Sequence, residues 1–154
     1  MQSNNMSKFE LAVTNTPDIA GGYKNGLQAF GRNSWFVEVD DTKKLEGSVD
    51  IDECTKELYP DEPRWDYALG YGGKAYFIEV HPASTSDVKT VIEKAKWLDG
   101  WLNAKAKELK ALKAGNNLYW VASGKVNILR TSRQYRMLMQ SKILLCNRFK
   151  PAVR

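Results

Sequence analysis

The sequence predicts a single α/β domain in which helices flank a central mixed sheet. Three observations carry this prediction. The chain has 154 residues, a length that suits one hydrophobic core. Hydrophobic residues make up 43% of it and charged residues 27%, as in ordinary folded proteins. Short runs rich in aromatic and β-branched residues alternate with helical patterns, and no linker or repeat separates them, so we expect one domain over residues 1–154.

The first third of the chain carries the weakest structural signals. We expect residues 1–16 to form a poorly ordered N-terminal segment. Residues 17–32 show a short helical pattern that Gly21, Gly22 and Gly26 weaken. Residues 35–39 are aromatic and β-branched and predict a strand. Val49 and Ile51 alternate with aspartates and predict another short strand.

The middle of the chain predicts a β-hairpin. Two runs rich in aromatic and β-branched residues flank Gly72-Gly73, a dipeptide suited to the positive φ values of a tight turn. With this turn, the residue numbers of each pair of opposed residues add up to 145, which places Asp66 opposite Glu79. Pro63 and Pro82 obey the same rule, and prolines suit the place where pairing ends because they donate no backbone hydrogen bond.

The strand period of two sorts the side chains of this hairpin onto two faces. One face is apolar and largely aromatic: Trp65, Tyr67, Leu69, Tyr71, Tyr76, Ile78 and Val80. The other face carries the charged side chains: Arg64, Asp66, Ala68, Phe77, Glu79 and His81. We therefore expect the first face to pack and the second to hold charge.

The second half of the chain predicts two helices and a buried strand. Apolar residues recur at spacings of three and four over residues 88–112, which predicts a long helix from Ser84 or Ser86 to Lys113 that covers one face of the sheet. The apolar run at residues 118–122 predicts a buried strand, and a turn leads from it to residues 126–129. A last helix is predicted over residues 132–147.

Simple patterns exclude several classes of protein. No apolar run approaches the ~18 residues needed to cross a bilayer, and the first residues lack the features of a signal peptide. We therefore expect a soluble, cytoplasmic protein with no membrane partner. Cys54 and Cys146 are far apart, and His81 is the single histidine, so neither a disulfide framework nor a zinc site is predicted.

Charge is distributed unevenly along the chain. Residues 1–82 contain 8 Lys and Arg against 14 Asp and Glu, a net charge of −6, whereas residues 83–154 contain 15 against 4, a net charge of +11. A basic half favours a polyanionic partner such as nucleic acid, because cations that neutralise phosphates release counterions. The alternative is a solvated, lysine-rich surface.

Asp66 and Glu79 are the strongest candidates for chemistry. Opposed residues in a hairpin have Cβ atoms ~4.5 to 5.5 Å apart, where like charges destabilise the sheet and should raise the pKa of at least one carboxyl group. A divalent cation would compensate, since Mg²⁺ is held by one or two carboxylates together with water and substrate phosphate. The alternative needs no metal: Arg64 pairs with Asp66, and a nearby lysine satisfies Glu79.

Residues 64–69 (RWDYAL) and 77–81 (FIEVH), joined by the hairpin turn, resemble the core of the PD-(D/E)XK nuclease superfamily. In that family an aspartate opens the second strand and a Glu-x-Lys motif lies on the third. The helix and strand that follow match the family's order, so the resemblance covers residues 20–124 and implies a restriction-endonuclease-like core. It also implies that Asp66 and Glu79 bind Mg²⁺ or Mn²⁺, and that a lysine orients or activates the attacking water.

The third position of this motif departs from the family, because His81 stands where lysine is usual. A neutral imidazole can act as a general base near pH 7, but it lacks the fixed charge of lysine. The alternative is a structural histidine at the end of a strand. Lys96, which lies off the apolar stripe of the long helix, is a candidate replacement. The chain offers no clear match to the acidic residue that the family often adds from its first helix.

Three further groups have both a structural and a functional interpretation. Trp97 and Trp101 lie one turn apart on the long helix, where they could stack on bases, although core packing is the commoner role. An acidic cluster could extend the metal site or form a solvated loop: Asp50, Asp52, Glu53, Glu57, Asp61 and Glu62. The C-terminal arginines could contact phosphates or only solvent: Arg130, Arg133, Arg136, Arg148 and Arg154.

Together these observations predict a Mg²⁺-dependent endonuclease that hydrolyses phosphodiester bonds in nucleic acid, with DNA the expected substrate. Asp66, Glu79 and His81 are its predicted catalytic residues, and the first two are its metal ligands. One alternative is an inactive nuclease-like module that binds nucleic acid or protein. Another is an interaction protein that uses its basic helices on an acidic protein partner. A homodimer or a larger complex is compatible with each hypothesis.

Overall fold

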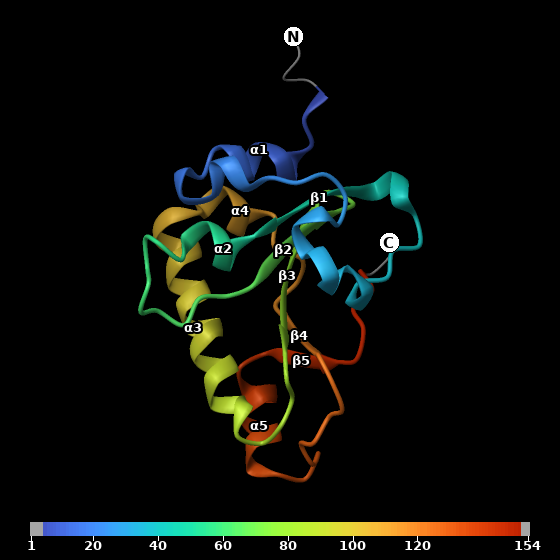
Figure 1. Ribbon diagram of the computed structural model, residues 1–154, viewed down its shortest axis with the longest axis vertical. Coiled ribbons are helices and arrows are strands. Elements are labelled where there is room, and N and C mark those ends of the chain that lie inside the picture. Colours follow the sequence, from blue (N-terminus) through green and yellow to red (C-terminus); the bar gives the residue numbers. More distant parts are fainter. Residues whose placement is uncertain (1–4, 152–154) are drawn as a thin grey trace.

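The computed structural model describes residues 5–151 and contains a five-stranded mixed sheet flanked by helices, as the sequence predicts (Figure 1). The strands lie in the order β1-β2-β3-β4-β5. Neighbours are antiparallel among β1 (Leu45–Asp50), β2 (Tyr67–Tyr71) and β3 (Lys74–His81), whereas β4 (Leu118–Ala122) runs parallel to β3 and β5 (Ile143–Cys146) runs parallel to β4.

The β2–β3 hairpin has the predicted register. Tyr71 pairs with Lys74 across the turn, and every partner pair of the ladder sums to 145. The two turn glycines have φ values of 59° and 80°, as a tight hairpin turn requires. Asp66 immediately precedes β2, so the same register places it opposite Glu79. A shift by one residue would have sent these two carboxylates to opposite faces.

Both faces of this hairpin pack, which corrects the expectation that one face would hold mainly charge. The aromatic face of β2 and β3 joins a buried cluster with Phe30 and Phe149. On the other face, Ala68 and Phe77 belong to the larger cluster beneath the helices. Trp65 was predicted on the aromatic face but lies in this larger cluster, because it precedes β2 and its direction is not fixed by the pleat.

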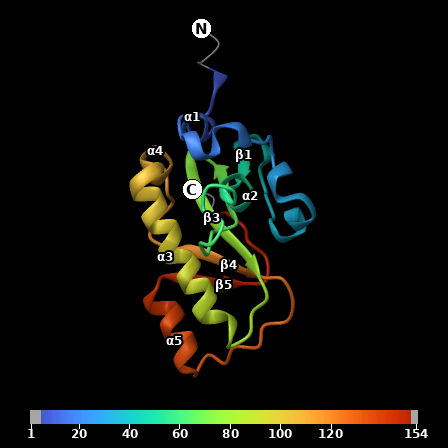
Figure 2. The same ribbon diagram turned by 60° about the vertical axis from the view of Figure 1, so that its left-hand side comes forward.

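Helix α3 (Asp87–Lys105) lies along one side of the sheet, with the 3-10 segment Gln28–Phe36 on the other (Figure 2). Its buried side chains include the predicted ones: Val91, Ala95, Leu98 and Leu102. The helix ends earlier than predicted because Ala106 leaves the helical conformation, at φ −138° and ψ 48°, and the short α4 (Lys107–Ala111) follows. Ser86 precedes α3 but makes no capping hydrogen bond through its side chain.

The predicted C-terminal helix is divided into a helix and a strand. Helix α5 (Arg133–Gln140) is capped by Ser132, whose Oγ accepts a hydrogen bond from Tyr135 N. Residues 143–146 then form β5 at the sheet edge. A short continuous apolar run fits a buried strand as well as a helix, so periodicity alone does not separate them. Residues 126–129 form no strand; a single bridge joins Asn127 to Ser84.

The N-terminal segment corrects two expectations. Helix α1 (Lys8–Thr14) lies within the stretch expected to be poorly ordered, and its Phe9, Ala12 and Val13 are fully buried; residues 1–4 lie outside the described part. Residues 35–39 form no strand, because the 3-10 segment extends to Phe36 and a single bridge joins Val37 to Phe149.

Within residues 5–151, the helices are too short or too polar for any of them to traverse a bilayer.

Gly70 of β2 is where one added methyl group should most disturb this packing. A Cβ at Gly70 would lie 2.6 Å from Phe9 Cβ and 2.7 Å from its Cδ2, and Phe9 is fully buried. We expect Gly70→Ala to destabilise the protein by about 1 to 3 kcal/mol, measured by urea denaturation. Gly124→Ala is the control, because a Cβ there meets no atom within 4 Å. Equal midpoints for the two variants would contradict the packing of α1 on β2.

Candidate active site

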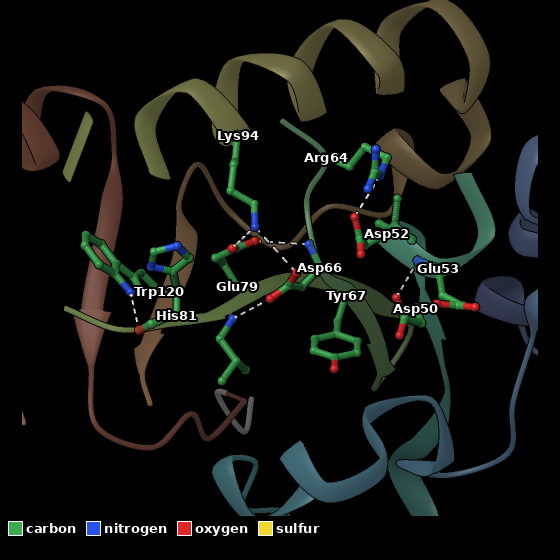
Figure 3. Close-up of polar contacts among 12 residues, drawn as sticks. Asp50, Asp52, Glu53, Arg64, Asp66, Tyr67, Glu79, His81, Lys94 and Trp120 are labelled. Carbon is green, nitrogen blue, oxygen red and sulfur yellow. Dashed lines mark hydrogen bonds and ion pairs between the residues drawn. The ribbon is translucent and has the colours of Figure 1, made fainter. Parts of the chain in front are cut away.

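Asp66, Glu79 and Lys94 converge at the open end of the hairpin, beneath α3 (Figure 3). Asp66 precedes β2, Glu79 lies on β3, and Lys94 reaches down from α3. Lys94 Nζ lies 3.6 Å from Asp66 Oδ1 and forms an ion pair with Glu79 Oε2. Three charged side chains from three different elements therefore meet at one place.

Backbone hydrogen bonds fix both carboxylates. Val80 N donates to Asp66 Oδ2 at 3.0 Å, and Asp66 N donates to Glu79 Oε1 at 3.1 Å. Each carboxylate thus accepts a backbone N–H of the opposite strand just beyond the last pair of the β2–β3 ladder. The second oxygen of each carboxylate remains for Lys94.

The site is largely buried but reaches solvent on one side. The Glu79 side chain is 0% exposed, whereas Lys94 is 15% and Asp66 is 20% exposed. Within the described residues, Glu79 Oε2 accepts no hydrogen bond of good geometry, and its partner is the charge of Lys94. An incoming ligand can therefore reach Asp66 and Lys94 first, with Glu79 behind them.

Burial controls the charge of these groups. It raises the pKa of Glu79 to about 8, and the charge of Asp66 adds to this rise while Lys94 opposes it. Burial also raises the pKa of Asp66 against the opposing effect of Lys94. Burial alone would lower the pKa of Lys94, but the two carboxylates outweigh it and the pKa is raised. Lys94 is therefore a cation at neutral pH, and the raised carboxyl pKa values are due to burial more than to mutual repulsion.

His81 makes its contacts outside this group. Its Nδ1 lies 2.9 Å from Pro82 O and 3.8 Å from Asp87 Oδ1. Its ring meets Trp120 edge-on, with centroids 6.2 Å apart, and Trp120 Nε1 donates to its backbone oxygen. These contacts fit the structural interpretation of His81, and its catalytic role stays a prediction.

Lys94 is the residue that sequence reasoning missed, two positions before the candidate Lys96. Lys96 is exposed and contacts neither carboxylate among the described residues. A signal for Lys94 was present, because it lies three residues after Val91 and four before Leu98, both buried. A lysine at that spacing points toward the sheet, and lysines are rarely buried unless they are paired.

The acidic cluster divides into structural contacts and the border of the site. Asp50 Oδ1 accepts a hydrogen bond from Glu53 N at 2.8 Å and caps α2 (Ile51–Thr55). Arg64 Nε donates to Asp52 Oδ1 at 2.8 Å, so the arginine expected beside Asp66 pairs with Asp52. Burial raises the pKa of Asp50 to about 6, with a contribution from the charge of Asp66. Asp50 therefore lies within the electrostatic field of the site.

Asp66 and Glu79 fit a small divalent cation. Their second oxygens face the same ammonium group, so one cation position already lies between them. Mg²⁺ needs one or two protein carboxylates when water and phosphate complete its coordination. Groups of three or more His, Cys, Asp or Glu side chains placed for a metal are absent from residues 5–151, so these residues provide no fully protein-built metal cage.

No known protein-family model matches this chain, and neither a curated protein nor a solved structure is significantly similar to it.

Proposed function

We propose that this protein is a metal-dependent nuclease that hydrolyses phosphodiester bonds in nucleic acid, with DNA the expected substrate. The convergence of Asp66, Glu79 and Lys94 carries this proposal. Two carboxylates and a lysine are the residue types of the PD-(D/E)XK motif that the sequence resembles, with the lysine supplied by α3 in place of β3. The order of elements around the site also agrees with that resemblance.

Each residue has a distinct role in the proposed reaction. Asp66 and Glu79 would hold Mg²⁺ or Mn²⁺, which when bound would polarise the phosphate and promote ionisation of water. Lys94 would stabilise the negative charge that develops on the phosphate as water attacks and the P–O bond breaks. Its raised pKa favours this electrostatic role over that of a general base. Lys94 contacts both carboxyl groups, and it would be free to contact phosphate where a bound cation takes its place beside them.

The direct test is cleavage of plasmid, linear duplex and single strands with Mg²⁺ or Mn²⁺. We expect cleavage that EDTA stops and that Asp66→Asn or Glu79→Gln abolishes. Both variants keep a carbonyl oxygen to accept the backbone hydrogen bond of the hairpin. Intact substrates under all of these conditions would reject the nuclease proposal.

Metal binding should also be visible without any substrate. Millimolar Mg²⁺ or Mn²⁺ should raise the melting temperature, because a ligand that binds only the folded state stabilises it; at 100 times the Kd the gain is about 2.7 kcal/mol. Asp66→Asn should remove the rise, and Glu57→Gln, an exposed change in the acidic cluster, should keep it. Equal rises in both variants would place the cation elsewhere.

Basic residues of the second half would bind the phosphate backbone. Arg130, Arg133 and Arg136 are exposed around the start of α5. Each phosphate neutralised contributes a slope of about −0.9 to log affinity against log salt on duplex DNA, so four contacts would weaken binding about 100-fold between 50 and 200 mM salt. Fluorescence anisotropy with a labelled duplex measures this slope. Binding that is indifferent to salt would favour a protein partner.

A second candidate function is an inactive module that binds nucleic acid. The observation that favours it is His81 at the motif's lysine position, with Lys94 ion-paired to the carboxylates. Salt-dependent DNA binding without cleavage in either metal would assign this function. His81→Lys tests it further, because restoring the lysine of the motif should then create activity.

A further inference from the structure

We propose that a cavity beside the candidate active site binds an unpaired nucleobase of a single-stranded nucleic acid by stacking; this inference rests on the proposed function and adds a substrate feature to it. The cavity has a volume of about 350 Å³, within the range of sites that accept small organic groups. It lies between α3 and the loop of residues 56–66. Its principal lining residues are Tyr59, Lys96, Trp97, Gly100, Trp101 and Lys105.

Three aromatic rings form one wall of the cavity. Trp97 and Trp101 are stacked, with centroids 5.7 Å apart and an interplanar angle of 12°, and Tyr59 meets Trp97 edge-on at 5.8 Å. Trp101 is only 4% exposed, as its expected role in the core requires. Trp97 and Tyr59 are partly exposed, so they present aromatic surface on which any base can stack.

Hydrogen bonds hold this wall in place. Asp18 Oδ2 accepts from Tyr59 Oη at 2.7 Å and from Trp101 Nε1 at 3.0 Å. One carboxylate therefore fixes two of the rings through their polar atoms, and Trp97 packs between those rings. A preorganised surface binds more tightly because less conformational freedom is lost on association.

Gly100 keeps the cavity open. It lies inside α3, where glycine destabilises a helix by about 1 kcal/mol relative to alanine, and it is not among the glycines with positive φ. A Cβ at this position would meet no atom within 4 Å. Neither the backbone nor the packing requires glycine here, and a side chain at this position would enter the space of the cavity.

The tryptophans of the cavity lie one and two turns along α3 from Lys94. Lys94, Trp97 and Trp101 follow one another at spacings of three and four and lie on one flank of α3. At 1.5 Å per residue, the tryptophans lie roughly 4.5 and 10 Å along the helix from Lys94. This separation matches about one to three nucleotides at 3.4 Å each along a stacked strand. A base in the cavity would thus belong to a nucleotide near the phosphate that Lys94 contacts.

The charges around the cavity favour a nucleotide over an apolar peptide. Among the described residues, Lys96 and Lys105 line it together with a single acidic side chain, Glu62. Ammonium groups beside an aromatic wall suit a base that carries phosphates on either side. An apolar protein segment would gain nothing from these lysines.

The test compares ligands that differ only in their bases. In EDTA, so that no strand is cut, the affinity of the wild-type protein is measured for labelled dT15 and for an abasic 15-mer with the same phosphates. We expect dT15 to bind about tenfold more tightly, from one stacked base. A parallel measurement with rU15 separates DNA from RNA as the source of the base. Equal affinities for dT15 and the abasic strand would overturn the proposal.

Two variants locate the effect. Gly100→Leu places a side chain in the cavity, where its Cβ meets no atom within 4 Å, and should remove the preference for dT15. Asn103→Leu, on an exposed part of α3 outside the lining, should retain it. Melting curves verify that both variants are folded. An unchanged preference in Gly100→Leu would reject this cavity as the binding site. A preference for dT15 without metal-dependent cleavage would support base binding in the cavity and reject the nuclease function. Metal-dependent cleavage without a preference for dT15 would support the nuclease function and reject base binding in the cavity.

Discussion

Lys94→Ala should reduce nucleic-acid cleavage by about 100- to 1,000-fold, the usual effect of removing one group that stabilises charge in a transition state. Lys94 contacts both candidate metal ligands, and in the proposed reaction its charge would face the scissile phosphate. Single-turnover cleavage at saturating metal measures the loss, and circular dichroism verifies the folded fraction. Lys94→Arg keeps the charge and should retain more activity than Lys94→Ala.

Two matched variants make this result specific. Lys89→Ala removes an exposed lysine of the same helix that lies outside the lining of the cavity, and His81→Ala removes the imidazole at the position of the motif's lysine. Both should remain within about tenfold of the wild-type rate, because neither side chain contacts Asp66 or Glu79 among the described residues. The opposite result, a large loss of activity in His81→Ala and a small loss in Lys94→Ala, would assign the role proposed for Lys94 to His81 on β3.

Lys94→Met should destabilise the metal-free protein by about 3 to 5 kcal/mol at pH 8 or above, as expected when a buried charge loses its partner. The loss should be smaller at pH 5, because Asp66 and Glu79 already have raised pKa values. Without the ammonium group these pKa values rise further, and the carboxyl groups take up protons as the pH falls. Urea denaturation at both pH values measures the difference.

The stability of the wild-type protein should also fall as the pH rises, by a smaller amount than that of Lys94→Met. The folded-state pKa of Glu79 is about 8 and its ordinary value is 4.5, so between these values the folded state binds more protons than the unfolded state. Stability contributed by this group therefore falls as pH rises through that window. Lys96→Met is the control and should show no additional pH dependence. A cost of Lys94→Met that is larger at pH 5 than at pH 8 would contradict the arrangement.

The hairpin was predictable because several independent signals agreed on it. Gly72-Gly73, the alternation of side chains and the two prolines all give the same register, and that register places Asp66 opposite Glu79. The apolar stripe of α3 was equally clear, since its buried residues recur from Val88 to Leu102, over about four turns. Both carboxylates of the site could therefore be found from residues 64–81 alone.

The missed elements had signals that were short or ambiguous. Ser7 and Glu10 have the Ser-x-x-Glu spacing of a helix start, but α1 is only seven residues long. The residues of β5 continue the apolar pattern of the preceding helix, so helix and strand could not be distinguished until the sheet edge was seen. The choice of Lys94 over Lys96 depends on how α3 is rotated over the sheet, which is a property of the packed fold.

The hydrogen bonds at the end of the hairpin join the chemistry of the site to the movement of its backbone. The amide groups of Val80 and Asp66 donate to the very carboxylates that would bind a cation. Separation of the strand ends would release both carboxylates, and a ligand held by both would oppose that separation. Local opening of the hairpin and ligand binding are therefore linked equilibria. The rate at which the amide hydrogens of Val80 and Asp66 exchange with solvent then reports how often the strand ends separate.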